Sequence, residues 1–103
     1  MNMNDYQAAA AKTAIYSAEH SVMYPSLGLT AEAGEVANKV KKILRDKHFD
    51  REAIASEIGD CLWYIAALCR DLNVDMADVA QANLDKLYDR KDRGVLGGSG
   101  DNR

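Results

Sequence analysis

Apolar residues recur every three or four positions through most of the chain, which is the spacing of an amphipathic α-helix. No run of alternating β-branched residues, which would favour a strand, interrupts this pattern. The pattern predicts helices over residues 5–17, 27–45 and 51–72, and a fourth helix that begins after an N-cap at Asp75 and reaches about Arg90. Because the connections are short, we expect an all-α fold, an antiparallel four-helix bundle.

The second and third predicted helices each carry an apolar stripe that we expect to form the core. These stripes comprise Leu29, Ala33, Val36, Val40, Ile43 and Leu44 on the second helix, and Ile54, Ile58, Cys61, Leu62, Ile65, Cys69 and Leu72 on the third. The third helix is also apolar on its opposite side, at Ala55, Gly59, Trp63 and Ala66, and a helix that is apolar all round is normally buried. We therefore expect Trp63 to anchor a subunit interface, the alternative being a tolerated surface tryptophan.

Length and glycine content divide the chain into two parts. A chain of 103 residues is large enough for one domain with a single core, and the helical pattern assigns residues 1–93 to it. Residues 94–103 hold four of the seven glycines, so we expect a flexible glycine-rich C-terminal tail.

Charge and cysteine usage narrow the classes of partner. A net charge of -3 argues against a general nucleic-acid surface, and no apolar run approaches the ~20 residues that span a bilayer. Cys61 and Cys69 lie too far apart along one helix to form a disulfide, which favours a reduced, cytoplasmic protein. We expect neither a nucleic-acid nor a membrane partner.

Two acidic pairs carry the candidate chemistry. Glu32 and Glu35 lie in the second predicted helix and Glu57 and Asp60 in the third, each pair three residues apart and therefore on one helix face. The two pairs have equal offsets from their core stripes, which places them either facing each other or facing apart. If they face each other, their mutual repulsion favours a bound hard cation such as Mg²⁺. The alternative to a metal site is that both acidic pairs lie on solvated helix faces.

The segments around these pairs resemble a known family. The string Gly28-Leu29-Thr30-Ala31-Glu32-Ala33-Gly34-Glu35-Val36-Ala37-Asn38-Lys39, followed by Glu57-Ile58-Gly59-Asp60-Cys61-Leu62-Trp63-Tyr64, is similar to the double motif of the MazG-like all-α nucleoside triphosphate pyrophosphohydrolases. The resemblance implies Mg²⁺-dependent hydrolysis of a (deoxy)nucleoside triphosphate to monophosphate and pyrophosphate, with Mn²⁺ as a substitute metal. It assigns Glu32, Glu35, Glu57 and Asp60 as metal ligands and catalytic residues, and it implies a homo-oligomer, either a dimer or a dimer of dimers.

A triphosphate substrate also needs cationic and stacking partners. The candidates are Lys39, Lys86, Arg90, Arg93 and Arg103 for the phosphates, and Tyr64 and Asn83 for the base or sugar. For the cations the alternative is a solvated helix-end charge, and for Tyr64 and Asn83 it is plain packing. We therefore predict a nucleotide pyrophosphohydrolase that controls nucleotide pools. The competing interpretation is a non-catalytic helical oligomerisation module whose acidic face binds ions.

Overall fold

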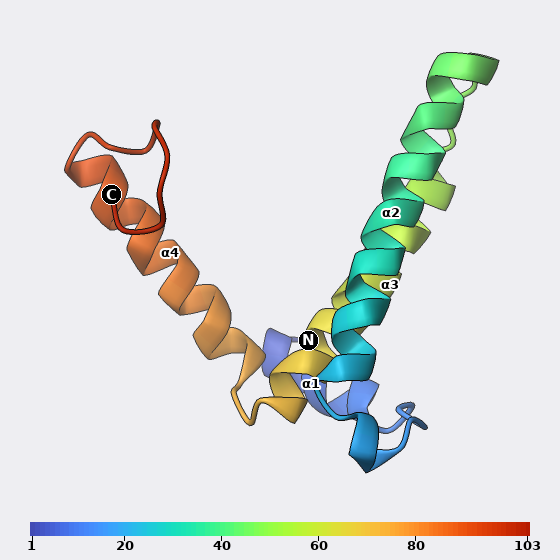
Figure 1. Cartoon of the computed structure of the whole chain (residues 1–103), viewed down its shortest axis with the longest axis horizontal. Helices are drawn as coiled ribbons and strands as arrows, with labels where there is room; N and C mark the ends of the chain where they lie inside the picture. Colours follow the sequence, from blue (N-terminus) through green and yellow to red (C-terminus); the bar gives the residue numbers. More distant parts are fainter.

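The computed structural model describes residues 1–103 as four α-helices and one short 3₁₀-helix, η1 (Ala18–His20), with no strand. The α-helices are α1 (Met3–Ala11), α2 (Met23–Asp46), α3 (Arg51–Asp71) and α4 (Met76–Asp92). The prediction of an all-α, four-helix fold is confirmed. Figure 1 shows α2 and α3 side by side as a long hairpin, α1 across its base, and α4 extending away as a separate arm.

The first helix begins two residues earlier than predicted, at Met3, where its start is capped locally. Asn2 accepts a hydrogen bond from the Asp5 backbone N–H at 2.8 Å, and Asp5 accepts one from the Asn2 N–H, which together form a capping box. The helix then ends at Ala11 rather than near Ser17, and the Thr13 hydroxyl donates to the Ala10 carbonyl. Residues 12–22 therefore form a long connection with one 3₁₀ turn.

The second helix starts four residues earlier than predicted. Pro25 was expected to end the preceding connection, but it lies buried in the first turn of α2. A proline fits there because the first backbone N–H groups of a helix have no partner within the helix. Val22, the N-cap residue, has a φ of 67° and offers no side-chain cap.

The core lies where α1 crosses the second half of α3. Its buried residues are Ala10, Ala66, Cys69 and Met76, and Tyr6, Trp63 and Ile65 pack against them. Small residues on both helices let the two backbones approach closely, and Ala66 is only 1% exposed. The Trp63 indole donates to the Thr13 hydroxyl at 2.7 Å. The expectation that a single chain leaves Trp63 uncovered is therefore wrong, because α1 of the same chain packs against it, whereas Ala55 and Gly59 on the same face stay exposed. The role of Trp63 in a subunit interface stays a prediction.

The fourth helix starts after Asp75 as predicted, but other residues supply its cap. Asp75 makes no side-chain capping bond. Instead Gln7 accepts from the Met76 backbone N–H at 2.8 Å, and Asn4 accepts from the Ala77 N–H at 3.0 Å. The Gln7 amide also donates to the Val74 carbonyl. Thus α1 fixes the direction in which α4 leaves the rest of the chain.

A single chain leaves much of its apolar surface uncovered. The radius of gyration is 16.5 Å, whereas a compact domain of this length has about 13 Å. Several members of the predicted core stripes are exposed, namely Val40, Leu44, Ile58, Leu62 and Leu72. The α4 arm adds Val79, Leu84, Leu87 and Tyr88. None of the helices combines the length and apolarity that a membrane span requires.

Candidate functional site

Three of the four predicted carboxylates meet between α2 and α3. An oxygen of Glu32 and one each of Glu57 and Asp60 lie within 4.8 Å of one another. The acidic pairs therefore face each other, which the sequence alone left open. Glu35, one turn further along α2, is exposed and lies outside this cluster.

Helix spacing beneath the carboxylates is set by a glycine and a tyrosine. The ring of Tyr64 lies against Gly28 so closely that a Cβ at position 28 would overlap it. Gly28 lies one turn before Glu32 on α2, and Tyr64 lies one turn after Asp60 on α3. The contact holds the two backbones close together next to the acidic cluster.

The cluster carries negative charge that no protein cation neutralises. Partial burial, a hydrogen bond with Glu57 and the charges of Asp60, Glu57 and Glu35 raise the pKa of Glu32 above its ordinary value. The ion pairs of the chain involve other residues: Glu19 with His20, Asp46 with Arg45, Asp71 with Arg70 and Asp89 with Arg93. Oxygen ligands that crowd together without a cationic partner suit a hard divalent cation.

An open pocket of about 270 Å³ lies beside the cluster, lined by Glu32, Asp60, Trp63 and Tyr64. The Trp63 and Tyr64 rings meet edge to face with centroids 5.0 Å apart. Burial, the neighbouring Tyr24 and the charges of Glu32 and Asp60 raise the pKa of Tyr64, so the phenol stays neutral. The pocket thus combines acidic oxygens with two aromatic surfaces.

Sequence reasoning missed three aromatic residues near this pocket. Trp63 had been assigned to an interface, although its position next to Tyr64 and three residues after Asp60 could have indicated the site. Tyr24 lies 6.3 Å from Tyr64 between ring centroids. Tyr6 of α1 has a pKa raised by burial and by the charge of Asp60. No local signal identifies Tyr6, because α1 reaches α3 only through the tertiary fold.

The other predicted substrate contacts lie elsewhere. Lys39 lines a second pocket of about 160 Å³ near the α2–α3 turn, with Lys42 and His48 among its neighbours. Asn83 and Lys86 are exposed residues of α4. Figure 1 shows this helix extending away from the α2–α3 hairpin that carries the acidic cluster. The exposure of Asn83 also argues against the packing role that was the alternative for it.

Figure 1 shows the C-terminal residues folded back over the end of α4. Three arginines hold them in this position. Arg103 donates to the carbonyls of Val95, Leu96, Gly97 and Gly100. Arg93 donates to the Asp89 carboxylate and to the Arg103 carbonyl, and the buried Arg90 donates to the Asp101 carbonyl. In this conformation the Arg103 guanidinium is fully engaged with the tail.

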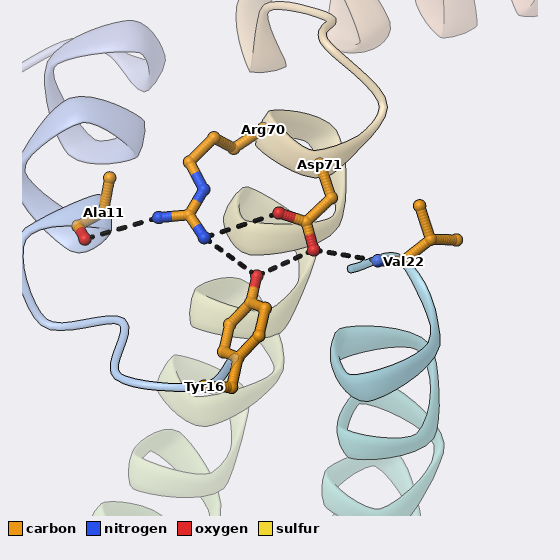
Figure 2. Close-up of polar contacts among 5 residues, drawn as sticks. All are labelled: Ala11, Tyr16, Val22, Arg70 and Asp71. Carbon is orange, nitrogen blue, oxygen red and sulfur yellow. Dashed lines mark hydrogen bonds and ion pairs between the residues drawn. The ribbon is translucent and has the colours of Figure 1, made fainter. Parts of the chain in front are cut away.

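A polar network joins the start of α2 to the end of α3 (Figure 2). One oxygen of Asp71 accepts from the Tyr16 hydroxyl at 2.8 Å and from the Val22 backbone N–H at 2.9 Å. Arg70 donates to the Tyr16 hydroxyl, to the other oxygen of Asp71 and to the Ala11 carbonyl. Burial favours the protonated form of Asp71, but the bonds from Val22, Tyr16 and Arg70 prevail and hold its pKa below the ordinary value.

The chain is similar to known proteins in sequence. Residues 21–95 match the family model of the MazG nucleotide pyrophosphohydrolase domain. The chain is 48% identical to the Gene 37 protein of Mycobacterium phage L5 over an alignment of 114 residues that covers 100% of both chains. No solved structure matches the chain.

Proposed function

The chain belongs to the MazG nucleotide pyrophosphohydrolase family, and from this membership we propose that it hydrolyses nucleoside triphosphates to monophosphate and pyrophosphate with the help of Mg²⁺. The observation that supports the proposal is the meeting of Glu32, Glu57 and Asp60 across the hairpin, with no protein cation among them. In the cell, such an activity would control the nucleotide pool or remove unwanted nucleotides.

The carboxylates fit a hard metal ion by number and by chemistry. Glu32, Glu57 and Asp60 would hold Mg²⁺, or Mn²⁺ as a substitute, and Glu35 is the fourth carboxylate that the family motif assigns. The bound metal would neutralise the polyphosphate and lower the pKa of a coordinated water. A carboxylate of this set that is not fully used in metal ligation would accept the proton of the attacking water.

The aromatic side of the pocket suits a nucleobase. Trp63 and Tyr64 offer ring surfaces within the same open pocket as Glu32 and Asp60. Stacking on an aromatic ring contributes about 1–3 kcal/mol per base and tolerates every base. A base held there would direct its phosphates toward the carboxylates.

We further propose that a second copy of the chain completes the site. The pocket of about 270 Å³ is smaller than most small-molecule sites and has no cationic side chain in its lining. The cationic candidates Lys86, Arg90 and Arg93 lie on the α4 arm, which also carries exposed Leu84 and Leu87. An α4 arm from another subunit would cover the apolar hairpin and bring cations toward the triphosphate. A dimer or a dimer of dimers fits this arrangement.

Release of pyrophosphate from a panel of nucleoside triphosphates, with and without Mg²⁺, tests the proposal. We expect Mg²⁺-dependent release from the wild type and loss of at least about 100-fold in Glu32→Gln and Asp60→Asn, since each removes a proposed ligand. Asp78→Asn, an exposed acid on α4, serves as the control and should keep full activity. If Mg²⁺ binds but no triphosphate is cleaved, the chain is instead an ion-binding oligomerisation module.

A further inference from the structure

The hydrogen bonds of Asp71 lie at the open end of the α2–α3 hairpin, outside the acidic pocket. We propose that Asp71 is a positioning residue that sets the axial register of α2 against α3 and thereby brings Glu32 level with Asp60, about one turn from Glu57. The importance of this register for metal binding rests on the proposed function, whereas the register itself does not.

The distances along the two helices support this role. Glu32 lies ten residues after Val22, and Asp60 lies eleven residues before Asp71. At 1.5 Å per residue these offsets are about 15 and 16 Å, measured in the same direction along the antiparallel hairpin. Joining the Val22 N–H to Asp71 therefore places the Cα atoms of Glu32 and Asp60 at about the same height.

The same register accounts for the contact between Gly28 and Tyr64. Gly28 lies six residues after Val22 and Tyr64 seven residues before Asp71, so both are about 10 Å from the open end. Only a residue without a Cβ fits under the Tyr64 ring. A slip of one turn, about 5.4 Å, would replace Gly28 beneath that ring by a residue with a side chain, either Pro25 or Ala31. Such a slip would also exceed the 4.8 Å span of the carboxylates.

The backbone at Val22 indicates that this end of the hairpin is held under constraint. Its φ of 67° is an unfavourable conformation for a β-branched residue and persists only where the surroundings enforce it. The N-terminus of α2 has no side-chain cap of its own, and Asp71 supplies an anionic acceptor at this positive helix end. Tyr16 strengthens the tie, because its hydroxyl bonds Asp71 while its ring stacks on Tyr24 of α2 at 4.7 Å.

Substitutions at Asp71 separate positioning from general stability. Asp71→Ala removes the bonds to Val22 and Tyr16. Asp71→Asn keeps them, because one amide oxygen can replace the single carboxylate oxygen that accepts both. Met76→Ala is the matched control, since it creates a cavity in the core cluster, against α1 and α3, without removing any hydrogen bond of Asp71.

Two measurements then report on the register. In NMR spectra of the wild type, the Tyr64 ring should shift the Gly28 Hα resonances and give NOEs to them. Both features should persist in Asp71→Asn and in Met76→Ala. Both should be lost in Asp71→Ala. In a Mg²⁺ titration followed by the emission of Trp63, the sole tryptophan, we expect affinity to fall about tenfold in Asp71→Ala and by less than about threefold in Asp71→Asn.

Each outcome decides one question. If Asp71→Ala keeps the Gly28 features, the turn between α2 and α3 sets the register alone and the proposal is wrong. If Asp71→Ala and Met76→Ala lose Mg²⁺ affinity equally, Asp71 acts only through stability. A wild type that does not respond to Mg²⁺ would contradict the proposed metal site, and the NMR comparison would still decide the register.

Discussion

Tyr64 lies across Gly28, and the absence of a side chain at position 28 is what allows α2 and α3 to approach next to the acidic cluster. The other two glycines of the hairpin differ. Gly34 and Gly59, each between the acids of a pair, have no heavy atom near the position of an added Cβ. Of the three glycines of the hairpin, only Gly28 meets a neighbour within one chain.

The contrast among the glycines predicts opposite effects of one added methyl group. Gly28→Ala should lower the free energy of unfolding by about 1–3 kcal/mol, because the Tyr64 ring must move. Gly34→Ala should raise it by up to about 1 kcal/mol, since alanine favours the helix and the added methyl meets open space. Chemical denaturation of both variants at equal protein concentration measures the difference. Equal destabilisation would mean that Gly34 is also in contact, as it would be in a subunit interface.

The raised pKa of Glu32 predicts how stability depends on pH in the metal-free protein. Because the folded state binds this proton more readily than the unfolded state, stability should increase as the pH falls from neutral through the raised pKa, down to about the ordinary 4.5. Below that pH both states are protonated and the gain is complete. Thermal unfolding with EDTA across this range should show the increase in the wild type and a smaller one in Glu32→Gln.

The same thermal unfolding experiment, repeated with saturating Mg²⁺, tests metal binding. A bound divalent cation favours the ionised carboxylates, so the increase in stability on acidification should disappear or reverse when Mg²⁺ is present. A stability profile unchanged by Mg²⁺ would argue against metal binding by Glu32, Glu57 and Asp60.

The exposed apolar face of α4 predicts self-association. Leu87→Asp places a charge on this face and should shift the protein toward monomers, with loss of activity in parallel if the site is shared. Ala82→Asp introduces the same charge at an exposed position on the opposite side of α4 and should leave assembly unchanged. Sedimentation velocity at micromolar concentration compares them. A wild type that sediments as a monomer would contradict the proposed oligomer.

The bonding of Arg103 predicts a specific role for the last residue. Arg103→Ala should release residues 94–103, seen as faster exchange of the Val95 amide, which donates to the Arg90 carbonyl, with little change in the melting temperature. Arg103→Lys should fail to restore protection, because a single ammonium group cannot reproduce the planar set of donors that bonds four carbonyls. If the amide exchange of Arg103→Ala is as slow as that of the wild type, the tail folds back without the guanidinium.

Periodicity predicted the four helices well, because each has a face that repeats at the helical spacing. It failed at the start of α2, where Pro25 was interpreted as the end of a connection although a proline also fits a first turn. It also failed for Trp63. A helical wheel reveals two apolar sides of α3 but does not tell which side the chain covers by itself.

Helical spacing also predicted part of the acidic cluster. Spacing placed Glu57 beside Asp60 on one helix face, and family resemblance paired them with Glu32 and Glu35. The structure brings Glu32 to the cluster and leaves Glu35 outside it. Which carboxylates meet depends on the rotation and register of α2 against α3, and these follow from contacts such as Gly28 with Tyr64 that no local pattern contains.

The bonds from Asn4 and Gln7 to the start of α4 join the two ends of the sequence, across 67 to 73 positions. The α2–α3 hairpin, by contrast, joins neighbouring segments and closes only a short turn. We therefore expect the hairpin to form early in folding and α4 to take its direction last, after α1 has docked, because distant contacts carry a larger entropy of loop closure. Until α1 docks, the α4 arm has no fixed direction, so any association that depends on this arm must follow the folding of the single chain.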